Sequence, residues 1–117
     1  MIARNPMLKI LVLCSRNQWR SPTAEALYRD DPRVVVRSAG TSPQARVRVS
    51  EKLLRWADRI LVMEHRHRRQ LVAQFPALLA ELDVAVLGIP DDYAYMDADL
   101  CALLRAEIEA VLAEATE

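Results

Sequence analysis

The stretch LKILVLC, residues 8–14, constrains the fold of this chain most, because it is apolar apart from Lys9. A strand with one face in water alternates apolar and polar residues, whereas a strand covered on both faces is apolar almost throughout. Strands of the second kind belong to parallel sheets that carry helices on both faces. Residues 8–14 are therefore predicted to form a strand buried in such a sheet.

Strand-like and helix-like patterns alternate along the rest of the chain. Further strands are predicted at residues 33–40, 59–63 and 83–89, and residues 41–49 have no regular pattern. This alternation predicts an α/β fold, with a four-stranded parallel sheet flanked by helices on both faces. With 117 residues, the chain suits a single domain spanning 1–117.

The first helix is expected to have Ser21 as its N-cap and Pro22 as its first residue, and to end at Asp31-Pro32. Other helices are predicted at residues 50–57, 64–75 and 98–115. The last of these is expected to present an apolar face formed by Leu100, Leu103, Leu104, Ile108, Val111 and Leu112.

Composition excludes several classes of protein. The 16 basic and 16 acidic residues balance, so the net charge gives no indication of nucleic-acid or membrane binding. No apolar run approaches the ~18 residues of a membrane helix, and the start of the chain is interpreted as a strand rather than a signal peptide. Cys14 and Cys101 form neither a zinc nor a disulfide framework, which favours a cytoplasmic protein.

The segment CSRNQWRS, residues 14–21, joins the first strand to the first helix. Ligands of parallel α/β sheets bind at this end of the strands, and backbone amides at a helix N-terminus stabilise thiolates and bind anions. Arg20 would add a guanidinium fork for phosphate oxygens, and the Ser21 hydroxyl would hydrogen-bond the Cys14 sulfur. The segment is therefore predicted to be a phosphate-binding loop. The alternative is a cysteine packed in the core and a solvated arginine.

With its flanking residues, VLCSRNQWRSPTAEA resembles the phosphate-binding loop of the low-molecular-weight protein tyrosine phosphatases, which carry Cys-x5-Arg-Ser-Pro after their first strand. SAGT at 38–41, ADRILVME at 57–64 and IPDDY at 89–93 extend the resemblance over nearly the whole chain. Arg16 stands where the family usually has glycine, and Trp19 where a second cysteine is often found.

The resemblance implies a metal-independent phosphomonoesterase, a tyrosine phosphatase acting through a phosphocysteine, with no cofactor. Cys14 would be the nucleophile, Arg20 the transition-state clamp, and Asp91 the general acid that later activates water. Phosphorylated substrates, phosphate and vanadate would bind the loop. The remaining implied roles are substrate binding by Ser15, Arg16, Asn17, Gln18, Trp19 and Ser21, and bracing of the loop by Asn17 and Ser38.

Several alternatives stay open. Tyr93 would either stack on an aromatic substrate or cover the edge of the sheet. An arsenate reductase of the same fold would need further cysteines, for which Cys101 is the one candidate, although its helical pattern indicates core packing. A non-catalytic phosphate-binding module is the third hypothesis.

His65 and His67 are two residues apart on a predicted helix and should face different sides, so a metal pair is not expected there. The run RHRR at 66–69 is typical of a solvated face or of a surface for an acidic partner.

Overall fold

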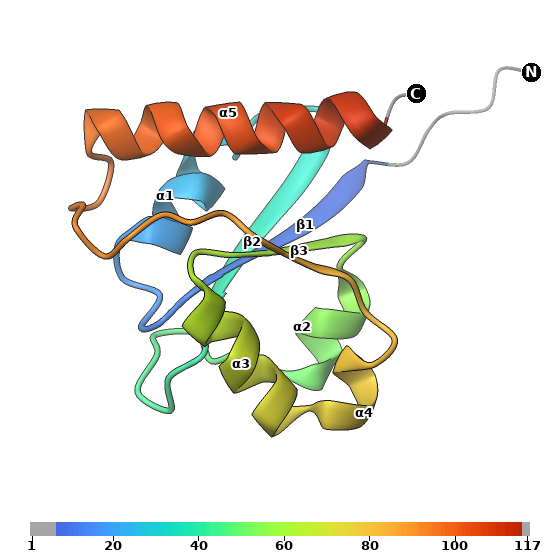
Figure 1. Cartoon of the computed structure of the whole chain (residues 1–117). Coiled ribbons are helices and arrows are strands. Elements are labelled where there is room, and N and C mark those ends of the chain that lie inside the picture. The colour runs from blue at the N-terminus through green and yellow to red at the C-terminus, as the bar shows by residue number, and fades with distance from the viewer. Residues whose placement is uncertain (1–6, 116–117) are drawn as a thin grey trace, which may run out of the picture.

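A computed structural model describes residues 7–115 of the chain (Figure 1). Residues 1–6 and 116–117 lie outside the described residues. All eight belong to the predicted single domain, and residues 1–6 also belong to the start of the chain that was interpreted as a strand. The strands are β1 (Leu8–Cys14), β2 (Val34–Gly40), β3 (Arg59–Val62) and β4 (Val84–Val86). They form one sheet in the order β2-β1-β3-β4, and every neighbouring pair is parallel, which confirms the predicted fold class.

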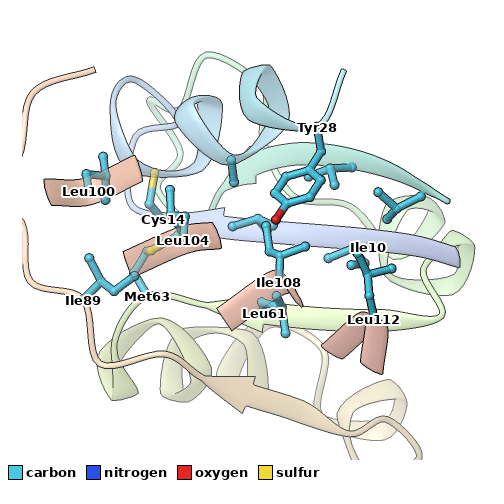
Figure 2. Packing of buried hydrophobic residues seen from close by; sticks show 14 residues of the cluster. Ile10, Cys14, Tyr28, Leu61, Met63, Ile89, Leu100, Leu104, Ile108 and Leu112 are labelled. Atoms are coloured by element: carbon cyan, nitrogen blue, oxygen red, sulfur yellow. The ribbon is translucent and has the colours of Figure 1, made fainter. Parts of the chain in front are cut away.

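Successive residues of β1 enter two separate hydrophobic cores, because side chains alternate between the faces of a strand. Ile10, Val12 and Cys14 belong to the core shown in Figure 2, which includes residues of α1 (Arg20–Leu27) and α5 (Ala98–Ala115). Leu11 and Leu13 belong to the second core. That core includes residues of α2 (Glu51–Trp56), α3 (His65–Gln74) and α4 (Pro76–Leu79). Helices therefore cover both faces of the sheet, as the apolar run at 8–14 predicted.

Helix α5 has the predicted bounds but a narrower apolar face than predicted. Its buried residues are Leu100, Leu104, Ile108 and Leu112, whereas Leu103 is 40% exposed. Since each helical residue advances by about 100°, Leu103 lies roughly 120° from the centre of the buried stripe. Placing Leu103 in the core was therefore wrong, although Val111 does pack against the core.

The other differences from the sequence predictions lie at element ends. Helix α1 begins at Arg20 with Trp19 as N-cap, and it ends at Leu27, so the prediction of Ser21 as N-cap was wrong. The Ser21 hydroxyl instead contacts the loop that precedes the helix. Pro76 ends α3 as predicted but also begins the short helix α4, because proline is well tolerated in a first turn. No helix within residues 7–115 is both long and apolar enough to cross a membrane.

Candidate active site

The loop between β1 and α1 is held by its carbonyl groups. Backbone oxygens of residues 14–17 accept hydrogen bonds of 2.9 to 3.2 Å from donors in segment 41–46. Within residues 7–115, the backbone amides of residues 15–20 donate no hydrogen bond. The amides are thus left free to bind an anion, as in other anion-binding loops at helix N-termini.

Gly40, at the end of β2, lets segment 41–46 approach the loop this closely. A Cβ atom at Gly40 would lie 2.5 Å from the Ser15 carbonyl oxygen and 2.6 Å from the Ala45 Cβ. Both distances are far below van der Waals contact, and the nearer atom is backbone that has little room to move. The glycine of SAGT is therefore required by the packing beneath the loop.

Cys14 is the last residue of β1, and a small polar network surrounds its sulfur. The Ser21 Oγ lies 3.0 Å from the Cys14 Sγ, and the Asn17 Nδ2 donates hydrogen bonds of 2.9 Å to the hydroxyls of Ser21 and Ser38. Asn17 is fully buried and has a φ of 58°, in the left-handed region that asparagine tolerates better than most residues. These contacts agree with the bracing expected of Asn17 and Ser38, and they place the Ser21 hydroxyl beside the thiol.

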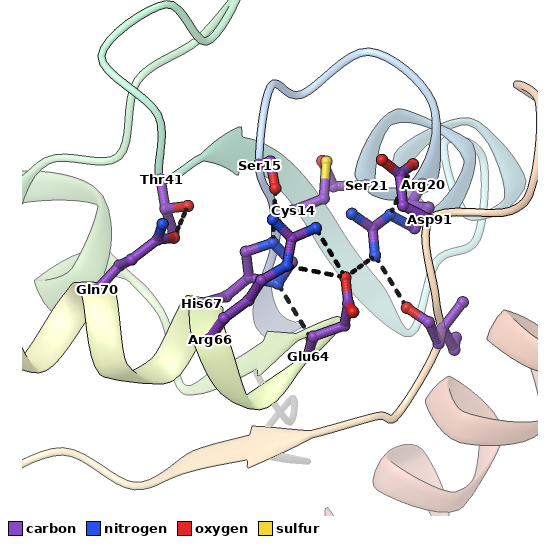
Figure 3. Close-up of polar contacts among 11 residues, drawn as sticks. Cys14, Ser15, Arg20, Ser21, Thr41, Glu64, Arg66, His67, Gln70 and Asp91 are labelled. Atoms are coloured by element: carbon purple, nitrogen blue, oxygen red, sulfur yellow. Dashed lines mark hydrogen bonds and ion pairs between the residues drawn. The ribbon is translucent and has the colours of Figure 1, made fainter.

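Arg20 is 2% exposed and is oriented by two acceptors. Its Nη1 donates to the Glu64 Oε1 at 2.7 Å and to the carbonyl oxygen of Ile89 at 2.9 Å (Figure 3). Its Nε lies 3.7 Å from the Asp91 Oδ1, and Asp91 is half exposed. The guanidinium is therefore fixed on one edge, and it meets the carboxyl group of Asp91 at the end of the sheet where the carboxyl ends of β1 and β4 lie.

Glu64 accepts hydrogen bonds from two arginines. Besides Arg20, its Oε1 accepts a hydrogen bond of 2.9 Å from the Arg66 Nη2. Burial acts to raise the pKa of the Glu64 carboxyl, but the hydrogen bonds from Arg20 and Arg66 outweigh it and hold that pKa below its ordinary value. Glu64 thus pairs with two guanidiniums, and Asp91, 3.7 Å from the Arg20 Nε, is a second carboxylate beside them.

His67 connects α3 to the loop. Its Nδ1 accepts a hydrogen bond from the backbone amide of Glu64 at 3.1 Å, so in the neutral ring the Nε2 carries the proton and donates to the Ser15 Oγ at 2.8 Å. Ser15 can then donate its own hydroxyl proton to a ligand. Burial, followed by repulsion from Arg20 and Arg66, lowers the pKa of His67 to about 4. The imidazole is therefore neutral near pH 7.

A cavity of about 380 Å³ opens over the loop. Its walls are formed by Cys14, Ser15, Arg16, Gln18, Trp19, Arg20, Thr41, Ser42, Arg66, Gln70 and Asp91. Of the residues assigned to the site from the sequence, seven line it, while Asn17, Ser21 and Ser38 lie buried behind the wall as its support. Trp19 is 50% exposed, so an indole face is available at the rim.

Tyr93 does not line this cavity. It is half-buried and packs against the core shared by α1 and α5. Asp92 is exposed and also lies outside the cavity wall, unlike Asp91.

Cys101 is half-buried on α5, so its packing is less complete than expected. His65 is exposed whereas His67 is buried, so the two do face different sides, and no group of three potential metal ligands occurs within residues 7–115.

Sequence reasoning missed three parts of the site: Glu64, His67 and segment 41–46. The first two carry a readable signal, because Glu64 and His67 form a capping box at the start of α3, in which each side chain binds the other residue's backbone amide. Segment 41–46 carries no such signal, since three of its four hydrogen bonds to the loop come from backbone amides and only one comes from a side chain, the Arg46 Nε.

The assembled groups suit chemistry at a tetrahedral anion. Free amides and the Arg20 guanidinium supply donors for an oxyanion, the Cys14 thiol lies at the base of the cavity, and the Asp91 carboxyl lies at its mouth. Such a combination provides a nucleophile, charge stabilisation and a proton donor without a metal ion.

No protein-family model and no curated protein matches the chain in sequence. Solved structures do match. The tyrosine phosphatase Wzb from Escherichia coli K30, in complex with phosphate, is 25% identical over 93% of this chain and 99% of that chain, with a TM-score of 0.71. The low-molecular-weight phosphotyrosine phosphatase from Vibrio cholerae O395 is 22% identical over 94% and 97% of the two chains, with a TM-score of 0.74.

A third structure, of the YwlE arginine phosphatase, is 26% identical over 90% of this chain and 91% of that chain, with a TM-score of 0.60. It is a cysteine-to-serine mutant in which the active-site serine is phosphorylated. The matches confirm the family resemblance read from the sequence, and all three proteins are phosphatases.

Proposed function

We propose that this chain, a cysteine-dependent phosphatase with the fold of the low-molecular-weight protein tyrosine phosphatases, hydrolyses phosphotyrosine in proteins through a phosphocysteine intermediate. The observation that carries the proposal is the convergence of Cys14, Arg20 and Asp91 on one cavity whose floor is a loop of free backbone amides. Binding of phosphate by the related Wzb and phosphorylation of the YwlE active-site serine support the same chemistry.

In the first step, the Cys14 thiolate attacks the phosphorus atom, and a sulfur–phosphorus bond forms as the bond to the leaving oxygen breaks. Asp91 gives its proton to that oxygen, so the product leaves as a neutral phenol. Arg20 and the amides of residues 15–20 bind the three phosphoryl oxygens, whose charge they balance in the transition state. The Ser21 hydroxyl, 3.0 Å from the sulfur, stabilises the thiolate both before attack and as it departs.

In the second step, the Asp91 carboxylate removes a proton from a water molecule whose oxygen attacks the phosphorus. The sulfur–phosphorus bond breaks, the thiolate is regenerated, and inorganic phosphate leaves. Because phosphate and vanadate fit the same set of donors, both are expected to compete with substrate for the loop.

Charge and shape at the rim favour an aryl phosphate over a phosphorylated guanidino group. The exposed indole of Trp19 offers an aromatic face beside the loop, and aromatic rings stack favourably on such a face. A guanidino group, which is cationic once released, would meet Arg16 and Arg66 on the same wall. Asp91 is the one carboxylate among the lining residues.

The test compares Asp91→Ala with its neighbour Asp92→Ala on a phosphotyrosine peptide, a phosphoarginine peptide and p-nitrophenyl phosphate. We expect Asp91→Ala to slow phosphotyrosine hydrolysis by about 10²–10⁴-fold, with a smaller loss on the activated ester, and Asp92→Ala to have little effect. Cys14→Ser should abolish turnover but still bind phosphate. Faster hydrolysis of phosphoarginine than of phosphotyrosine by the unmodified enzyme would refute the substrate assignment, and turnover by Cys14→Ser would refute the covalent step.

A further inference from the structure

A second cleft, of about 370 Å³, borders the catalytic cavity on the side of α3. Its walls are formed by Glu64, His65, Arg66, Arg69, Gly88 and Pro90. Arg66 lines both hollows, and Pro90 directly precedes Asp91, which lines the catalytic cavity. Apart from Gly88 and its two chain neighbours, no residue has a heavy atom within 4 Å of the position that a Cβ of Gly88 would take, so the space beside this glycine is open.

The charge of this cleft is positive and largely unbalanced. Its one carboxylate, Glu64, already accepts hydrogen bonds from Arg20 and Arg66. The Arg69 side chain is exposed and makes no ion pair or side-chain hydrogen bond within residues 7–115. His65, also exposed, lies on the same wall. A ligand group that enters the cleft therefore meets the Arg69 guanidinium, which pairs with no carboxylate of residues 7–115, beside the Arg66 guanidinium, which is already hydrogen-bonded to Glu64.

We propose that this cleft binds an acidic side chain of the substrate, so that the enzyme prefers phosphotyrosine in an acidic sequence. The inference rests on the proposed function, because the phosphotyrosine must occupy the catalytic cavity for its neighbour to reach the cleft. Because the two clefts share Arg66 in their walls, and an extended peptide advances by about 3.3–3.6 Å per residue, we place the glutamate one to three positions from the phosphotyrosine. Arg66, which lines both, would contact the chain between them.

The chain offers a matched pair of variants. Arg69 lines the cleft, whereas Arg68 precedes it on α3, is also exposed, and lines neither the cleft nor the catalytic cavity. Two phosphotyrosine peptides are compared that differ only in glutamate or glutamine at the flanking positions, and kcat/KM for each is measured at low and high salt. Binding of the same peptides to Cys14→Ser is measured in parallel.

We expect the unmodified enzyme to prefer the glutamate peptide by roughly two- to fivefold at low salt, the range typical of exposed ion pairs, and less at high salt. Arg69→Ala should lose most of this preference, and Arg68→Ala should keep it. Equal kcat/KM for the two peptides, or an equal loss in both variants, would overturn the inference while leaving the proposed function intact. Failure of Cys14→Ser to bind either peptide would overturn both. Competition by a single-stranded oligonucleotide as strong as that by the glutamate peptide would assign the cleft to nucleic acid instead.

Discussion

Replacing His67 with glutamine should remove much of the acid sensitivity of this fold. His67 is fully buried, its pKa is lowered from 6.5 to about 4, and it hydrogen-bonds both the Glu64 amide and Ser15. The first cause of the lowered pKa is burial, and the second is repulsion from Arg20 and Arg66. Glutamine at the same position can keep the reciprocal hydrogen bond of the capping box but does not titrate.

Proton linkage gives the sign and the size of the change in the free energy of unfolding with pH. Between pH 6.5 and pH 4 the unfolded chain carries the proton on His67 and the folded chain does not, so the free energy of unfolding falls as the pH falls. With these two pKa values, the loss attributable to His67 is about 2 kcal/mol between pH 7 and pH 5, and about 3 kcal/mol between pH 7 and pH 4. Above pH 7 this contribution to stability is fully present.

Urea unfolding at pH 7, 5 and 4 measures the effect. Carboxylates titrate in the parent and in His67→Gln alike, so the difference between their pH dependences isolates the imidazole. The exposed His65 supplies the control, and His65→Gln should retain the steep pH dependence of the parent. Parallel curves for the parent and His67→Gln between pH 7 and pH 5 would show that burial of the neutral ring does not govern this dependence.

Two further predictions concern the support of the loop. Glu64→Gln should lower kcat/KM by roughly tenfold or more, because a charge-assisted hydrogen bond that orients Arg20 is weakened. Steady-state assays compare this variant with Glu51→Gln, which loses only an exposed pair with Arg55. Equal losses of kcat/KM in the two variants would contradict the role of Glu64. Asn17→Ala should cost about 2–3 kcal/mol in urea unfolding, because it loses two hydrogen bonds and places alanine at a φ of 58°. Asn17→Gly loses the same bonds without the backbone strain, so a stability no greater than that of Asn17→Ala would refute the role of φ.

Local patterns in the sequence were enough to predict the scaffold and to bring Cys14, Arg20 and Asp91 to one candidate site. The apolar run at 8–14 predicts a strand covered on both faces, and alternate residues of β1 do enter two different cores. The spacing of Cys14 and Arg20 around a strand–loop–helix boundary predicts that both face one hollow, and both line the same cavity. Asp91 follows the last strand, so the parallel topology brings it to the same end of the sheet.

Where local patterns gave a wrong prediction, contacts between segments distant in the sequence determined the structure. Ser21 reads as an N-cap, because serine commonly satisfies the first amides of a helix. In the fold its hydroxyl instead contacts Cys14 and Asn17, while the helix begins at Arg20, two residues before the predicted first residue. Leu103 reads as a core residue by its apolarity, but only the stripe that faces the sheet is covered, and Leu103 lies outside it.

The sequence by itself therefore determined the sheet, the loop and the identity of the chemical groups, because hydrophobic periodicity and residue type are properties of short segments. Only the tertiary structure decided how those groups are held. The bond from Arg20 to Glu64 joins residues 44 apart, and the bond from His67 to Ser15 joins residues 52 apart. The carbonyls of residues 14–16 accept hydrogen bonds from backbone amides of segment 41–46, which no side-chain pattern marks, and the Asn17 carbonyl accepts one from the Arg46 Nε. Contacts between distant segments depend on the register of packed strands and helices, which no local spacing specifies.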